Sequence, residues 1–186
     1  MALNAADGPL IHRYLAEEGL AARWTGEPTP LTSEEIRAAY PGFRFYYTFK
    51  FPPNPPGAPM PDLIEAHQRA MEDYEKHSLR LTVGIDEGGH VHAFRLPQDF
   101  NVGLRPVTSD GAARTAAAAI LSLMSAEQAS PGVIPAQEVS VTKGAAGWTC
   151  RISQKPRGVQ GEVAFDLVGR CTSASKSLNY SRPVPP

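Results

Sequence analysis

The stretch FRFYYTFKF at residues 43–51 carries the clearest secondary-structure signal in the chain and decides the expected fold. Its aromatic residues alternate with arginine, tyrosine, threonine and lysine, and this period of two is typical of a β-strand with one buried face. We expect the aromatic face to lie over a hydrophobic core; the alternative is a strand that lines a ligand cavity. The residues expected on the inner face are Phe43, Phe45, Tyr47, Phe49 and Phe51.

Three helices are expected around this strand. They are predicted at 9–18, 33–39 and 62–77, with a stiff proline-rich loop at 52–61. In the first helix, Pro9 suits the first helical position and Gly19 is a suitable stop. In the second, Thr32 and Glu35 have the spacing of a capping box, so Thr32 is the expected N-cap.

The C-terminal half is expected to be mainly antiparallel sheet. The predicted elements are a hairpin of 79–85 and 90–96, an alanine-rich helix at 110–126 capped by Asp110, strands at 137–142, 147–153 and 162–170, and a weaker strand at 175–180. Hairpins and meanders imply antiparallel pairing. The sequence therefore predicts an α+β fold, with a mostly antiparallel sheet, three to four helices and a C-terminal β-meander. We expect one domain over 1–186, with flexible ends at 1–8 and 181–186.

Composition excludes several classes of function. The chain has 186 residues and a formal net charge of −1, so it offers no basic field for a nucleic-acid backbone. No apolar run is long enough to span a bilayer, and the first residues lack the pattern of a signal peptide. The sequence contains no nucleophile elbow, no phosphate-binding glycine-rich loop and no common zinc motif. We therefore predict no catalytic residue and no cofactor.

Two histidines are the best candidates for chemistry. His90 and His92 lie two residues apart on the expected return strand, so both project from one face, about 6.6–7 Å apart along the chain. Asp86, Glu87 or His67 could add a third ligand for a metal ion. No standard spacing supplies that ligand, and we predict no metal site. His67, His90 and His92 remain candidate binding residues, although a core histidine with one hydrogen-bond partner is the simpler interpretation of His67.

Cys150 and Cys171 are the only cysteines, and they could form one disulfide or remain two buried thiols. We predict that both point inward, lie close together and can form the bond. A simple hairpin of 147–153 and 162–171 argues against this, because it would separate the two residues by ~20 Å. The limit on the Cα separation in a disulfide is roughly 7 Å. A disulfide would indicate an extracytoplasmic protein, and free thiols would fit the cytoplasm.

Residues 85–171 contain the IDEGGHV segment at 85–91, an alanine-rich helix ending in ILSLM at 120–124, and the GWTC segment at 147–150. This order of elements resembles the N-terminal barrel of the large lipid-transfer proteins, the vitellogenin group. It implies that Cys150 and Cys171 are the bonded pair, and that the module handles lipid or docks to a protein. The chain departs from the family in its N-terminal helices and in the helix at 62–77.

The leading hypothesis is a non-enzymatic binding or structural module that engages a protein partner or an apolar or lipid ligand through its sheet. The alternative is a small α+β cavity enzyme with a cone-shaped fold similar to the nuclear-transport-factor-2 group, using a histidine and a carboxylate. A closed apolar pocket that contains one of the candidate histidines would favour the enzyme, and a filled core would favour the module. The sequence does not indicate an oligomeric state.

Overall fold

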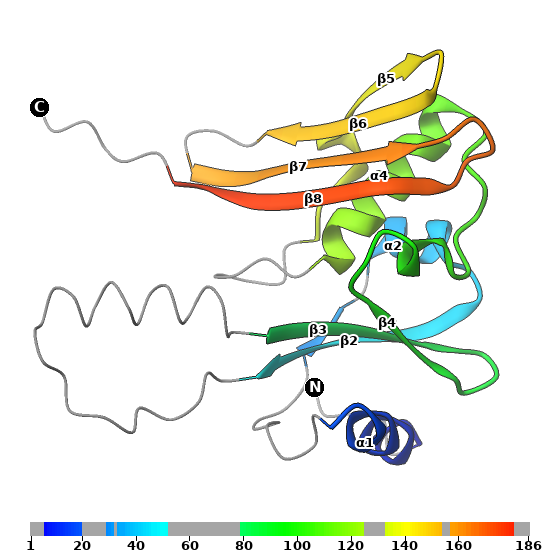
Figure 1. The fold of residues 1–186 in the computed structure, drawn as a ribbon, viewed down its shortest axis with the longest axis vertical. Helices are drawn as coiled ribbons and strands as arrows, with labels where there is room; N and C mark the ends of the chain where they lie inside the picture. The colour runs from blue at the N-terminus through cyan, green and yellow to red at the C-terminus, as the bar shows by residue number, and fades with distance from the viewer. Residues whose placement is uncertain are drawn as a thin grey trace, which may run out of the picture.

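The computed structural model describes residues 6–19, 29–31, 33–51, 79–124, 133–153 and 157–180. They form an α+β fold with two four-stranded antiparallel sheets, each a meander in sequence order (Figure 1). The first sheet contains β1 (Thr29–Pro30), β2 (Phe43–Phe51), β3 (Leu79–Asp86) and β4 (Val91–Phe94). The second contains β5 (Ser140–Gly144), β6 (Gly147–Ser153), β7 (Arg157–Phe165) and β8 (Cys171–Tyr180). The predicted helix at 62–77, the loop at 52–61 and the predicted flexible end at 181–186 lie outside the described residues. Of the flexible end predicted at 1–8, residues 1–5 also lie outside, whereas Asp7 is buried and Gly8 begins α1.

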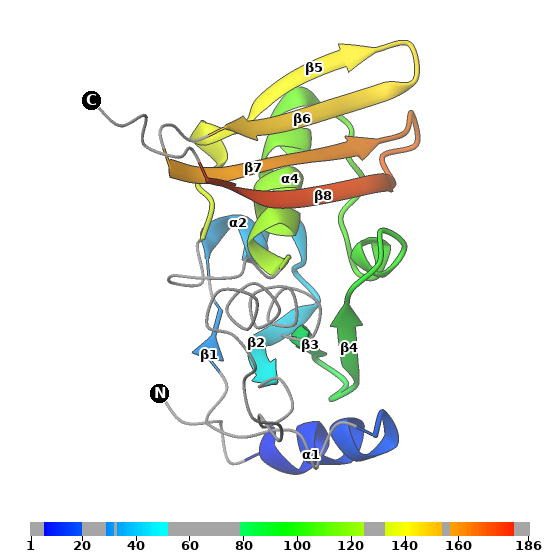
Figure 2. The ribbon, with the colours of Figure 1, turned by 60° about the vertical axis from the view of Figure 1, so that its left-hand side comes forward.

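The helices are arranged in layers with the sheets. They are α1 (Gly8–Glu17), α2 (Glu34–Ala39), α4 (Asp110–Leu123) and the 3₁₀ turns η2 (Asp99–Asn101) and η3 (Ala136–Glu138). Helix α4 contacts all four strands of the second sheet on one side and α2 on the other. Figure 2 shows α1 on the face of the first sheet that points away from α2 and α4. Within the described part of the chain, no helix has the length and apolarity needed to cross a membrane.

Helix α4 is the centre of the main core. Every residue from Ala116 to Leu123 is buried, because the helix lies between a sheet and another helix and its alanines allow close approach. Ser109 is the N-cap and accepts from the Ala112 N–H at 3.2 Å. Asp110, the predicted cap, is instead the first helical residue. Its carboxylate accepts from Trp148 Nε1 at 2.9 Å, which ties the start of the helix to β6.

The two N-terminal helices are near their predicted positions. Helix α1 ends before Gly19, whose φ of +68° is the left-handed conformation expected of a helix stop. The predicted cap of α2 was wrong by one residue, since Ser33, not Thr32, accepts from the Ile36 N–H at 3.0 Å. Glu35 does not complete a capping box. Its carboxylate accepts from the Ala136 N–H at 3.1 Å and links α2 to η3.

The aromatic stretch is a strand, β2, as predicted, but its first aromatic residue faces differently. A register shift lies between Phe43 and Phe45, so Phe43 pairs with Asp86 and Phe45 with Ile85. Phe43 packs in the main core, with its ring centroid 5.7 Å from that of Phe94. The register shift therefore interrupts the period of two at Phe43. The side chains of residues 44–51 lie outside the described set, and the inward position of Phe45, Tyr47 and Phe49 stays a prediction.

The C-terminal meander has four strands where three and a weaker one were predicted. The prediction at 147–153 is confirmed, while 137–142 begins in η3 and becomes β5 only at Ser140. The predicted strand at 162–170 runs through a turn. Asp166 Oδ1 accepts from the Val168 and Arg170 N–H groups, at 3.0 and 2.9 Å, so the chain reverses after Phe165. Cys171 consequently begins β8 and does not end β7.

Candidate functional site

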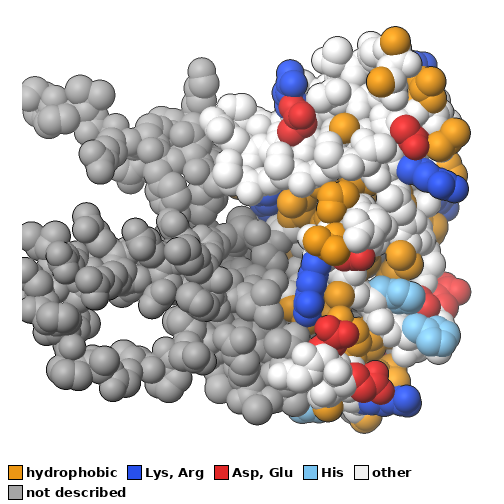
Figure 3. Space-filling model, viewed as in Figure 1, with side chains coloured by type: hydrophobic (Ala, Val, Ile, Leu, Met, Phe, Trp, Pro, Cys, Tyr) orange, Lys and Arg blue, Asp and Glu red, His pale blue; other side chains and the backbone are white. Residues whose placement is uncertain are grey.

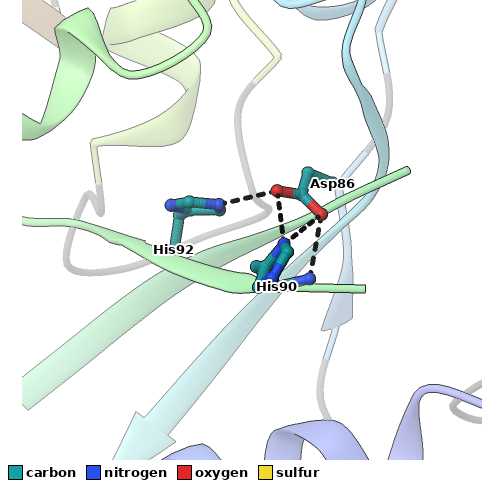
Figure 4. A network of polar contacts seen from close by, with 3 residues as sticks. All are labelled: Asp86, His90 and His92. Carbon is teal, nitrogen blue, oxygen red and sulfur yellow. Dashed lines mark hydrogen bonds and ion pairs between the residues drawn. The ribbon is translucent and has the colours of Figure 1, made fainter. Parts of the chain in front are cut away.

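The described side chains include one compact cluster of titratable groups, formed by Asp86, His90 and His92 at the β3–β4 turn (Figure 4). Asp86 Oδ2 lies 3.0 Å from His92 Nε2 and 3.2 Å from His90 Nδ1. A carboxylate can only accept, so each facing ring nitrogen carries its proton. His90 and His92 therefore lie on one side of the turn, as predicted, and both rings contact the Asp86 carboxylate.

The cluster lies at the surface. The exposed side-chain fractions are 77 % for His90, 31 % for His92 and 26 % for Asp86. The hydrogen bond from His92, together with the N–H and ring of His90, lowers the pKa of Asp86 to about 2. The His92 ring rests edge-on against Phe43, with centroids 5.3 Å apart, so His92 is held against the core while His90 points into solvent. In Figure 3, histidine atoms lie at the surface beside acidic ones.

Asp86 also fixes the turn, and a second turn shows that this role needs no histidine. The Asp86 N–H donates to the His90 carbonyl, the Gly89 N–H donates to the Asp86 carbonyl, and Asp86 Oδ1 accepts from the His90 N–H at 2.9 Å. The β7–β8 turn repeats all three bonds with Asp166, Gly169 and Arg170. The two glycines have φ values of +82° and +81°. Both turns therefore use an aspartate to hold the backbone. Only the contacts of Asp86 with the His90 and His92 rings are particular to the β3–β4 turn.

The chemistry available to the cluster is limited by its surroundings. A carboxylate-oriented imidazole can exchange a proton with a bound ligand. The space beside His90 is a groove of about 260 Å³ that is open to solvent, between α1 and the turn. It is lined by Leu10, Arg13, Tyr14, Glu17, Gly89, His90 and Val91. It does not enclose a ligand, and His92 does not line it, so the closed pocket that would favour the enzyme alternative is not formed at this cluster.

The other predicted metal ligands do not join the cluster. His67 lies outside the described residues, and Glu87 is exposed in the turn. Among the residues that the structure describes, no group of three or more histidine, cysteine, aspartate or glutamate side chains is arranged to hold a metal ion.

The two cysteines are free, buried thiols, so the disulfide considered from the sequence and from the resemblance is not formed. The strand register explains this. Cys150 pairs with Val163 on β7, and Cys171 pairs with Phe165 on the other side of β7. Residues two strands apart are separated by roughly 9.5 Å, beyond the ~7 Å limit for the Cα atoms of a disulfide. Burial raises the pKa of Cys150 to about 12 and that of Cys171 to about 11, so both are poor nucleophiles near neutral pH.

A second candidate site is apolar and was missed in the sequence. Of the five large hydrophobic side chains that are exposed in the described part of the chain, four lie on two adjacent loops. We call these four the apolar end: Leu96 (53 % exposed), Val102 (42 %), Leu167 (63 %) and Val168 (68 %). The Asn101 side chain joins the two loops, because its amide donates to the Cys171 carbonyl at 2.9 Å and its oxygen accepts from the Cys171 N–H at 2.7 Å.

The sequence contains a signal for the turn at the apolar end, although the apolar pattern over 162–170 predicts a continuous strand there. The segments DEGGH at 86–90 and DLVGR at 166–170 share an aspartate and a glycine three residues apart. An aspartate and a glycine at this spacing indicate a turn, which places Leu167 and Val168 at a hairpin tip, where apolar residues are unusual. The contribution of Leu96 and Val102 had no local signal, since it depends on how the two loops meet.

No protein-family model matches this chain, and neither a curated protein nor a solved structure matches it.

Proposed function

We propose that this chain is a non-enzymatic protein-binding module and that the apolar end is its binding surface. The observation that carries the proposal is the gathering of Leu96, Val102, Leu167 and Val168 on two joined loops. Single exposed apolar residues are ordinary, but several of them on neighbouring loops are more typical of an interaction site. A protein partner fits this surface better than an enclosed small molecule, because the buried side chains of each sheet pack against helices and leave no space there for a ligand.

The loops are held in fixed positions, which favours binding. Asp99 Oδ2 accepts from the Arg95 and Leu96 N–H groups at 3.0 and 2.7 Å. The Val107 N–H donates to the Gly169 carbonyl at 3.3 Å, so the chain after η2 is tied to the β7–β8 turn. A surface that is already ordered loses little conformational entropy when a partner binds.

The test replaces the most exposed pair and compares it with an exposed apolar residue elsewhere. A Leu167→Ser/Val168→Ser variant should keep its stability, because both side chains are in solvent, and should weaken partner binding by about tenfold or more. Val133→Ser is the matched control, since Val133 is 40 % exposed and lies outside the apolar end.

A photo-crosslinking residue at position 168 or 133 identifies the partner. The partner is then purified, and its affinity is measured for wild type, for Leu167→Ser/Val168→Ser and for Val133→Ser. Crosslinking from 168 but not from 133, with affinity lost only in the double variant, is the expected result. Equal affinity of all three proteins for the purified partner would overturn the proposal.

A further inference from the structure

Two arginines lie beside the apolar end. Arg105 and Arg170 follow its two loops in the chain, and both side chains are exposed. The two segments meet, because the Val107 N–H donates to the Gly169 carbonyl at 3.3 Å. Consecutive Cα atoms are about 3.8 Å apart, so both arginines leave the backbone within roughly 8 Å of this contact. Their charges therefore belong to the same surface as the exposed apolar side chains.

These two arginines differ from other exposed arginines in having no carboxylate partner. Arg13 and Arg95 each pair with a glutamate, at 2.9 and 3.8 Å. Within the described part of the chain, the side chains of Arg105 and Arg170 make no hydrogen bond or ion pair. One unpaired arginine on a surface is ordinary, but two beside one apolar surface offer a partner two charges that it does not have to release from other groups.

The carboxylates of the same two loops are turned toward the backbone. Asp99 Oδ2 accepts from the Arg95 and Leu96 N–H groups, and Asp166 Oδ1 accepts from those of Val168 and Arg170. Both aspartates are half-buried, whereas the arginines of these loops are exposed. The charged groups that the loops present to a partner are therefore cationic.

A hollow beside Arg105 gives an acidic group room to approach. It has a volume of about 320 Å³, is open to solvent and lies between α2 and the first turns of α4. Arg105 is the charged residue of its described lining, which also includes Thr108 and Thr115 and is otherwise made of alanine, glycine and proline. The small side chains leave the space, and an acidic side chain that enters it meets no like charge from the described residues.

We propose that the partner of the apolar end is an acidic polypeptide segment. Its apolar side chains cover Leu167 and Val168, and its carboxylates lie against Arg105 and Arg170. This inference rests on the proposed function and adds the chemistry of the partner.

Two other occupants fit the surface less well. Anionic membranes are recognised by clusters of about 4–8 lysines and arginines, and the two unpaired arginines fall short of that number. In a symmetric pair of copies the same patch meets itself, which would bring the arginines of one copy against those of the other. An acidic segment instead complements both charges.

The probe is a phage-displayed library of random linear peptides, selected on the intact chain and then measured as synthetic peptides. We expect peptides that combine apolar residues with aspartate or glutamate. Arg105→Gln/Arg170→Gln should weaken their binding about fivefold, and the difference should shrink as the ionic strength is raised. Arg13→Gln/Arg151→Gln removes the same charge from exposed positions outside the apolar end, so it is the matched control and should bind as wild type does.

A conservative pair separates loss of charge from loss of fold. Arg105→Lys/Arg170→Lys keeps both charges and should retain most of the affinity, and circular dichroism checks that each variant is folded. Equal weakening by the lysine and glutamine pairs would contradict a role of the charge and overturn the inference.

The remaining outcomes separate the inference from the proposed function. Peptides without acidic residues whose binding is lost only in Leu167→Ser/Val168→Ser overturn the acidic partner and leave the proposed function standing. Acidic peptides that need the arginines but bind Leu167→Ser/Val168→Ser normally contradict both, as does a selection in which no peptide depends on either pair. Tight binding to phosphatidylserine vesicles, or dimers in light scattering, that either variant pair abolishes would make a membrane or a second copy the occupant and overturn the inference.

Discussion

At the scale of single residues, Asp86 has the most distinctive environment. Three donors surround it: the His92 ring, the His90 backbone N–H and the His90 ring. They favour the ionised carboxylate and hold its pKa at about 2, below the ordinary value of 3.8. A folded-state pKa that lies below the unfolded one stabilises the fold at higher pH. That contribution is lost as the pH falls through 3.8 toward about 2.

Asp86→Asn should therefore lower the thermal midpoint near neutral pH, by an amount that shrinks as the solution is acidified and vanishes near the point where wild type is itself protonated. Thermal unfolding followed by circular dichroism over a series of pH values measures this difference. Glu87→Gln, in the same turn but exposed, serves as the control and should change the midpoint little at any pH. A deficit in Asp86→Asn that stays constant into strong acid would contradict the assignment.

The candidate site was only partly predictable at this scale. A period of two places His90 and His92 on one face, and Asp86 was among the possible partners. That Asp86 serves both rings follows from the turn, whose hydrogen bonds fix the carboxylate between them. The caps were each missed by one residue, because Thr32 beside Ser33, and Asp110 beside Ser109, offer equivalent side-chain acceptors. Only the three-dimensional start of the helix decides between such neighbours.

At the scale of elements, periodicity predicted strands well where nothing interrupted it. β2 and β6 have their predicted bounds. The period of two failed at Phe43, where the pairing register with β3 shifts, and at Leu167, where apolar residues continue through a turn. Hydrophobic periodicity reports burial, so it cannot distinguish an apolar residue inside a strand from one that a turn places in solvent.

The two aspartate–glycine turns allow a matched prediction. Gly89→Ala and Gly169→Ala force the same left-handed conformation on alanine, which costs about 1–2 kcal/mol. At position 89 the new Cβ would meet only the Leu10 side chain, at 3.6 Å, an ordinary contact. At position 169 it would lie 2.3 Å from the Val107 backbone nitrogen, which cannot move freely. Gly169→Ala should therefore lose more free energy of unfolding in chemical denaturation than Gly89→Ala, and equal losses would argue against the close approach of the two loops.

At the scale of the whole molecule, the buried residues form two separate clusters. The larger includes α2, α4 and the second sheet. The smaller consists of Ile11 and Leu15 of α1 with Leu81, Val83 and Ile85 of β3. A helix held by a small separate cluster can open without disturbing the rest of the core.

Native-state hydrogen exchange should show this difference directly. Amides of α1 are expected to exchange at a lower opening free energy than amides of α4. Leu15→Ala should increase exchange in α1 and leave the most protected amides of α4 nearly unchanged. His12→Ala, at an exposed position of the same helix, is the control and should have little effect on either. Identical opening free energies in α1 and α4 would mean that the two clusters unfold as one unit.

The β3–β4 and β7–β8 turns have the same backbone hydrogen bonds, so the two residues at the tip of one turn correspond to the two at the tip of the other. Glu87 and Gly88 occupy the two positions that Leu167 and Val168 occupy in the other turn, between the same anchoring aspartate and glycine. Exchanging the two dipeptides would move the apolar pair to the β3–β4 turn, where a Cβ at position 88 would lie 3.1 Å from His90 Nδ1, so the exposed His90 ring would have to shift. The same backbone turn therefore occurs twice in the fold. A protein engineer could use the β3–β4 turn to display a chosen dipeptide, and the His90 ring would limit the side chain at position 88.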